Sequence, residues 1–296
     1  MIVTTRNLKK LSVCAATFTV ALLSAIPATA QTINAFLSGP TATDTPYVSG
    51  GGITIKKNSF EAPAFSIPTG TRTTLLTDIV APDTNTANAP GTFGTYLFSQ
   101  GRAGLVAQGD TDDKFGNTTG QFIALGSNWT STTNSLTIDF ATSVRYLGFA
   151  WDAGDANNVI DFYNGNQYIA TYSTSQIISV INPSVAPPTV TASDNVTTYN
   201  KADYYGLPGS PSVNSGESYT YINFISTGGT FNRVVMSNIG QSGFEQDNHA
   251  TSENQLTPLG IFVPAGNAIV IPETGSLALM LIPLAGLGQI VVRRRK

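Results

Sequence analysis

The feature that most constrains the fold is a series of short runs in which apolar and polar residues alternate. Such runs occupy 135–140, 145–151, 159–163, 167–172, 219–225, 231–236 and 259–263. Alternation with a period of two places every second side chain on one face of a strand, as in a half-buried sheet. We therefore expect an all-β body, with one β-sandwich or jelly-roll domain over residues 31–264.

Turn-forming residues separate the runs. Asn164, Gly165 and Asn166 follow the run 159–163 and predict a short hairpin loop, because Asn and Gly tolerate positive φ angles. Residues 227–230 have the same role before 231–236. The segment 182–218 contains five prolines and is the longest irregular stretch, which predicts a surface excursion or a covering loop.

The C-terminal segment 265–296 is built like a sorting signal. A short linker leads to a motif at 271–275, an apolar run at 276–292 and a basic tail at 293–296. The motif contains Pro272, Glu273, Thr274 and Gly275, and the tail is Arg293, Arg294, Arg295 and Lys296. An apolar run of this length beside four cations predicts a marginal transmembrane helix with a positive-inside stop. Pro283 weakens that helix, so the segment suits transient retention in the membrane better than permanent anchoring.

Residues 1–30 have the pattern of a secretory signal peptide. A positively charged start precedes an apolar region, and Ala28 and Ala30 form a small-x-small cleavage site that makes Gln31 the mature N-terminus. The alternative, an N-terminal membrane anchor, is disfavoured by the shortness of the apolar region. We expect export through the secretory translocon.

The charge of the exported part limits its partners. Residues 31–292 carry eight cations and all 18 acids, a net charge of −10. Such a surface repels phosphate backbones and therefore disfavours nucleic acid as a partner. The one cysteine, Cys14, lies in the signal peptide, so we expect the mature protein to fold without a disulfide.

Both the tail and the body resemble one group of bacterial surface proteins. The tail is similar to the sorting domain of PEP-CTERM proteins, which an exosortase processes, although Thr274 stands where that motif usually has a second proline. Residues 136–173, 221–238 and 244–250 resemble the body of an exosortase-dependent family. The resemblance implies a secreted surface or matrix protein with no established catalytic activity, from a species that makes extracellular polysaccharide, which is a candidate partner. From the tail we expect transient anchoring in the inner membrane.

Two other interpretations of the tail remain open. The motif at 271–275 is one conservative change from the sortase signal of cell-wall proteins, where a transpeptidase cuts between Thr and Gly. The absence of a wall-binding spacer disfavours that interpretation. The third interpretation is a simple transmembrane anchor.

Catalytic motifs are scarce in the sequence. His249 is the one histidine, so a Ser–His–Asp triad would have to use it, and no Gly-x-Ser-x-Gly elbow supplies the serine. We expect a structural histidine hydrogen-bonded near a strand end. A pair of carboxylates for glycoside hydrolysis remains the enzymatic alternative, together with a carbohydrate-binding module on the same scaffold.

Two acidic segments are candidate calcium sites. The first contains Asp110, Asp112 and Asp113, and the second contains Asp152, Asp155 and Asn158. Calcium takes six to eight oxygen ligands from flexible loops, which such segments supply, but neither segment matches an EF-hand. The alternative is an Asx-turn or a solvated acidic loop. We expect no other cofactor.

Aromatic residues are the candidates for carbohydrate contact. Trp151 is expected to begin a loop at the domain rim, although a Trp at a strand end more often fills a core. Tyr204 and Tyr205 lie in the Pro-rich segment and are expected to form an exposed pair. Trp129, Tyr163 and Tyr168 are further aromatic candidates.

Overall fold

The computed structural model describes residues 31–40, 42–60, 72–74, 79–85, 91–98, 103–107, 121–125, 133–207, 215–239 and 243–265. These residues form antiparallel sheets with a single α-helix, so the all-β prediction is confirmed. Within them, no helix is both long enough and apolar enough to cross a membrane. The predicted signal peptide and the predicted motif, apolar run and basic tail at 271–296 lie outside the described residues.

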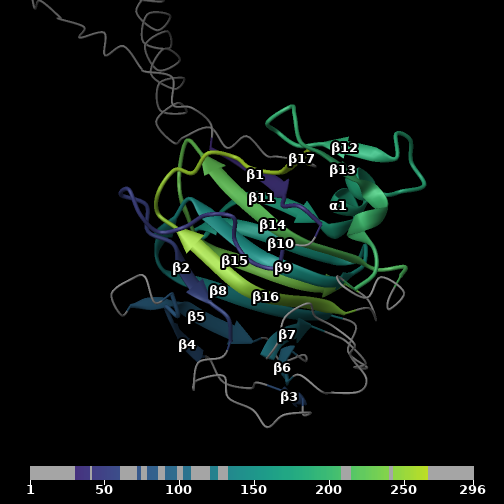
Figure 1. Cartoon of the computed structure of the whole chain (residues 1–296). Helices are drawn as coiled ribbons and strands as arrows, with labels where there is room; N and C mark the ends of the chain where they lie inside the picture. The colour runs from purple at the N-terminus through teal and green to yellow at the C-terminus, as the bar shows by residue number, and fades with distance from the viewer. Residues whose placement is uncertain are drawn as a thin grey trace, which may run out of the picture. The chain divides into compact units, whose positions relative to one another are not determined.

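The larger sheet has nine strands (Figure 1). In spatial order, eight of them are β17 (Ile261–Val263), β1 (Thr32–Leu37), β14 (Ser218–Thr227), β9 (Tyr146–Gly154), β16 (Phe244–Ser252), β7 (Gln121–Leu125), β6 (Ala103–Ala107) and β3 (Arg72–Thr74). The ninth, β2 (Lys56–Asn58), pairs with β16. Strands β9 and β16 therefore lie in the middle of the sheet, and all but one of the residues of β16 are buried.

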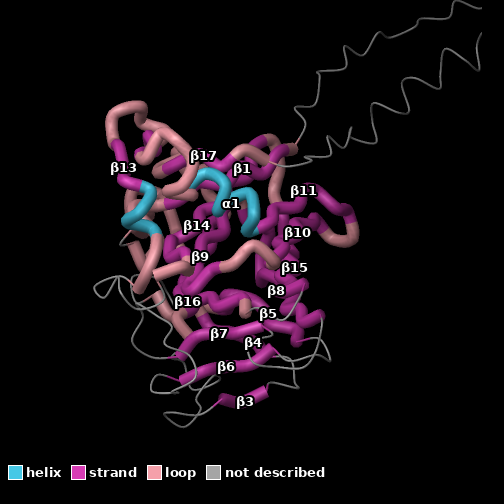
Figure 2. Tube along the Cα trace, turned by 90° about the vertical axis from the view of Figure 1, so that its right-hand side faces the viewer, coloured by secondary structure: helices cyan, strands magenta, loops and turns pink. Residues whose placement is uncertain are grey.

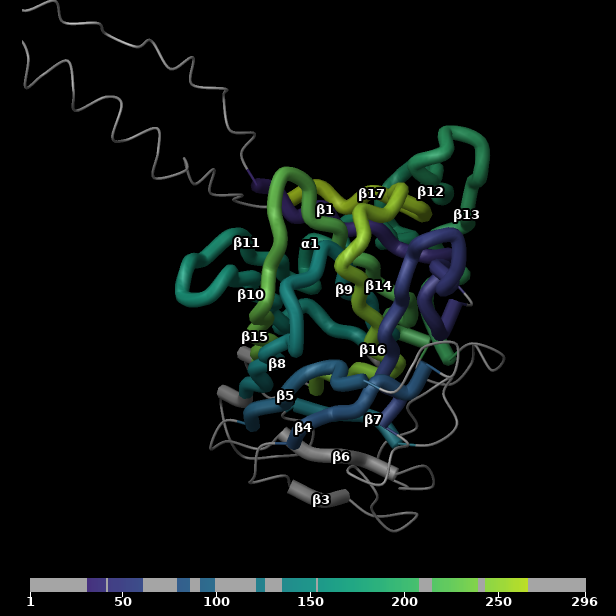
Figure 3. The backbone as a smooth tube through the Cα atoms, turned by 90° about the vertical axis from the view of Figure 1, so that its left-hand side faces the viewer, coloured from purple at the N-terminus to yellow at the C-terminus, as the bar shows by residue number. Residues whose placement is uncertain are grey.

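The smaller sheet has six strands and carries most of the predicted alternating runs. Its order is β11 (Gln167–Ser173), β10 (Asn158–Asn164), β15 (Phe231–Ile239), β8 (Thr133–Val144), β5 (Thr92–Phe98) and β4 (Ile79–Pro82). The hairpin β10–β11 turns at Gly165, whose φ of 59° is the left-handed conformation that the sequence predicted there. Figure 3 shows this hairpin projecting from the edge of the sheet.

The two sheets share one hydrophobic core. Alternation turns Ile160 and Phe162 of β10 inward. The ring of Phe162 contacts that of Phe224 in β14, with 4.9 Å between the ring centroids. The chain passes repeatedly from one sheet to the other, for example from β8 directly into β9 and from β14 through β15 to β16. Strands that follow one another in the sequence therefore often lie in different sheets, whereas the contact between Phe162 and Phe224 joins residues that are distant in the sequence.

The Pro-rich segment is more ordered than the sequence suggests. It contains the pair β12 (Thr189–Thr191) and β13 (Thr198–Asn200), followed by the 3₁₀-helix η2 (Lys201–Tyr204). The preceding helix α1 (Thr174–Ile181) buries Ile177 and Ile181 against the core. Figure 2 shows α1 at the end of the sheets that also holds β1 and β17.

Candidate functional site

Trp151 does not lie at the rim. It belongs to β9, and its side chain is fully buried in the core. Gly154 permits this position, because a Cβ atom there would lie 2.0 Å from Cε2 of the indole. The prediction of an exposed Trp151 is therefore wrong, since a ring enclosed on both faces fills the core instead of contacting a sugar.

The predicted exposed pair Tyr204 and Tyr205 is also wrong at Tyr204. Its side chain is fully buried, and its hydroxyl donates a hydrogen bond to the carbonyl oxygen of Ser38 at 2.9 Å. Tyr205 is half-buried. Tyr204 lies in the 3₁₀-helix η2, and its ring packs in the hydrophobic core. The sequence did not indicate this helix.

The three residues of the second calcium candidate lie in different surroundings. Asp152 is buried in β9 directly opposite Glu245 of β16, and burial raises the pKa of the Asp152 carboxyl to about 7. The Asp155 carboxylate accepts a hydrogen bond from the Asn157 N–H at 2.9 Å, which is the predicted Asx-turn alternative. The Asn158 amide donates to the carbonyl oxygen of Gly243 at 3.2 Å.

The part of the chain that the structure describes contains no group of three or more His, Cys, Asp or Glu side chains that could hold a metal ion. The first calcium candidate, Asp110, Asp112 and Asp113, lies outside the described residues. In the second candidate, Asp152 is buried, and Asp155 and Asn158 each hydrogen-bond to a backbone group.

His249 is enclosed by aromatic rings in the core. Its Nδ1 lies 2.8 Å from the hydroxyl oxygen of Tyr96, and its ring contacts those of Phe60 and Phe149. Burial lowers the pKa of His249 to about 3. The imidazole therefore stays neutral at neutral pH and lies away from both surface hollows described next.

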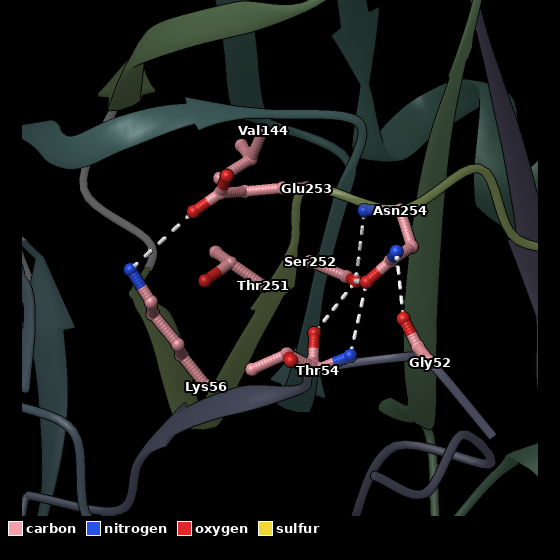
Figure 4. A pocket seen from close by; sticks show the side chains of 8 residues that line it. All are labelled: Gly52, Thr54, Lys56, Val144, Thr251, Ser252, Glu253 and Asn254. Atoms are coloured by element: carbon pink, nitrogen blue, oxygen red, sulfur yellow. Dashed lines mark hydrogen bonds and ion pairs between the residues drawn. The ribbon is translucent and has the colours of Figure 1, made fainter. Parts of the chain in front are cut away.

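A small polar pocket lies where the loop before β2 meets the end of β16 (Figure 4). It is lined by Gly52, Thr54, Lys56, Val144, Thr251, Ser252, Glu253 and Asn254 and encloses about 240 Å³. The Lys56 Nζ lies 3.7 Å from the Glu253 carboxylate, and the Asn254 side chain accepts a hydrogen bond from the Thr54 N–H at 2.9 Å. Ser252 Oγ donates to the Thr54 carbonyl oxygen at 2.7 Å. Because the lining groups bind one another, they hold the loop before β2 against the end of β16.

A larger hollow lies on the outer face of the six-stranded sheet. It encloses about 380 Å³, within the usual range for ligand sites. The lining residues are Leu97, Thr137, Tyr163, Gly165, Asn166, Arg233 and Val235. The Gly165 N–H donates to the Asn232 side chain at 2.7 Å, which holds the tip of the β10–β11 hairpin beside β15.

Strand register places a row of polar and aromatic side chains beside this hollow. Directly paired residues on five neighbouring strands form the row, which we call the outer row: Tyr168, Tyr163, Arg233, Asp139 and Thr95. Each of these residues is partly exposed. The register could not be predicted from the alternating runs, although alternation does place Tyr163, Arg233 and Asp139 on the faces opposite Phe162, Val234 and Ile138.

Contacts within the outer row fix its geometry. The Arg233 guanidinium binds the Asp139 carboxylate with two hydrogen bonds, of 2.5 Å from Nε and 3.0 Å from Nη2. This pairing raises the pKa of Arg233. The rings of Tyr163 and Tyr168 meet edge to face, with 5.7 Å between their centroids. The row thus presents a neutralised ion pair beside a pair of fixed aromatic rings.

Comparison with known proteins adds no assignment, since no family model, curated protein or solved structure matches the chain.

Proposed function

We propose that the chain is an exported cell-surface or extracellular-matrix protein with a structural or adhesive role, associated with glycan. Its two sheets form a β-sandwich of the jelly-roll type that carries the binding surface. The observation that carries the adhesive role is the outer row, in which aromatic rings and an ion pair lie partly exposed on an open sheet face.

The body of the protein is non-catalytic in this proposed role. The single histidine of the sequence is buried among aromatic rings with a pKa of about 3, so it does not serve as a general base at neutral pH. Asp152, the carboxyl group whose pKa is raised to about 7, is also buried, and it lines neither surface hollow.

Sorting is proposed from the sequence. The motif at 271–275, the apolar run at 276–292 and the basic tail at 293–296 support processing by an exosortase after secretion. Sortase attachment to a cell wall is the alternative for the same segment.

Fractionation of the native cells tests this function. We expect the mature chain in the surface or matrix fraction, where protease added to intact cells digests it. A chain that stays in the cytosolic fraction and resists added protease would exclude a surface role. Assays of the purified protein on the cells' polysaccharide should show binding without release of sugars, whereas release would favour the glycosidase alternative.

A further inference from the structure

The hollow beside the outer row combines an apolar floor with a polar rim. Leu97 and Val235 contribute half-buried aliphatic surface, whereas Arg233 and Asn166 bring hydrogen-bonding groups from the rim. A pyranose ring has the matching division, with C–H groups on its faces and hydroxyl groups at its edge. The partly exposed ring of Tyr163 adds a further apolar surface for such a face.

We propose that this hollow and the outer row bind an uncharged polysaccharide chain. The proposal rests on the surface location proposed above and names the ligand class of the adhesive face. The charge on the face distinguishes this ligand from an acidic polysaccharide.

The one cation of the outer row is already neutralised. Arg233 gives two of its five N–H donors to Asp139, and the remaining three suit neutral hydroxyl acceptors. Asp161 lies on the next row of the same face, beside Thr171 and Val235, so that Arg233, Asp139 and Asp161 together carry a net negative charge. Together with the net charge of −10 over residues 31–292, this repels an acidic chain.

The length of the outer row favours a polymer over a single sugar. The row crosses five strands from Tyr168 to Thr95. Four inter-strand steps of about 4.8 Å give a contact line of roughly 19 Å. The hollow is lined from β5, β8, β10, β15 and the tip of the β10–β11 hairpin, so a chain would seat one segment there and extend along the row.

The test uses the mature protein purified from the surface fraction of its own cells. The polysaccharide of those cells is separated by anion exchange into neutral and acidic fractions, and each fraction is immobilised. We expect retention on the neutral fraction, weakened at least tenfold by Tyr163→Ala and preserved by Tyr163→Phe. The matched control is Tyr205→Ala, which removes a half-buried tyrosine outside the hollow and should leave retention unchanged.

A second variant covers the case in which Tyr163→Ala does not fold. Thr137→Arg fills the hollow from β8 and should also weaken retention at least tenfold, with an unchanged melting temperature. Retention on the acidic fraction alone, on neither fraction, or equally for wild type and both folded hollow variants would overturn the proposal. If these binding results are negative but the mature chain is found in the surface fraction, the proposed ligand is wrong and the proposed location stands.

Discussion

His249 Nδ1 lies 2.8 Å from the hydroxyl oxygen of Tyr96, and this contact links the two sheets through the core. His249 belongs to β16 of the nine-stranded sheet, and Tyr96 belongs to β5 of the six-stranded sheet. Both side chains are fully buried. A polar contact in such a place favours the observed alignment of the sheets, because a shift that separated the two atoms would leave both without this partner in the core.

Removing the Tyr96 hydroxyl is expected to destabilise the body. In Tyr96→Phe, the His249 Nδ1 loses its partner inside the core, which costs about 1–3 kcal/mol. Urea unfolding followed by tryptophan fluorescence measures the loss. Tyr163→Phe is the control on the partly exposed outer face and should change stability by less than about 0.5 kcal/mol. Equal stability of the two variants would contradict a role for the His249–Tyr96 contact.

His249 is expected to destabilise the body in acid. Its pKa is lowered from 6.5 to about 3 in the folded state, so the unfolded chain binds the proton first. The stability contributed by the neutral form is present above pH 6.5 and is lost as the pH falls toward 3. The difference in unfolding free energy between wild type and His249→Phe should therefore change between pH 7 and 4. A pH-independent difference would show that His249 is not buried as a neutral group.

Asp152 is expected to act in the opposite direction. Burial raises its pKa from 3.8 to about 7, so the folded state holds the proton more tightly than the unfolded chain. Stability therefore falls as the pH rises from about 4 to 7, by a few kcal/mol at about 1.4 kcal/mol per unit of pKa. Asp152→Asn should match wild type near pH 4 and exceed it at pH 8 in urea unfolding. A constant offset between the two proteins across this range would refute the raised pKa.

The ion pair of the outer row is expected to matter little for stability. The side chains of Arg233 and Asp139 are 37% and 35% exposed, and exposed pairs contribute about 1 kcal/mol or less. Asp139→Asn should therefore keep the unfolding midpoint close to that of wild type. Its binding to the acidic polysaccharide fraction should increase, because Arg233 loses its neutralising partner. A large fall in stability would show that the pair supports the sheet instead of a ligand surface.

Local patterns predicted much of the strand structure. The hairpin at 164–166 is confirmed, since β10 ends at Asn164 and β11 begins at Gln167. The hairpin predicted at 227–230 is wrong, because the chain turns there but the flanking strands β14 and β15 belong to different sheets. Alternation reports which face a side chain occupies and contains no information on which sheet a strand joins. The outer row depends on that pairing, so its ion pair between Arg233 and Asp139 was not predicted.

Two elements were missed for identifiable reasons. Strand β16 turns Gln246, His249 and Thr251 inward, so its apolar alternation is absent. Helix α1 is short, although its start has a signal: Gln176 stands three residues after Ser173 and accepts a hydrogen bond from the Ser173 N–H at 2.7 Å. Trp151 is buried because β9 continues to Gly154, whose missing side chain leaves room for the indole, and a pattern that ends the strand at Trp151 does not reveal this.

The mass of the C-terminal peptide from surface-fraction protein decides whether the chain is exported and processed at its C-terminus, as we propose. We predict a peptide that lacks the apolar run 276–292 and the basic residues 293–296. Thr274 joined to a wall fragment would indicate a sortase in place of an exosortase. An intact peptide ending at Lys296 would contradict processing altogether and leave a permanent anchor as the explanation of the tail.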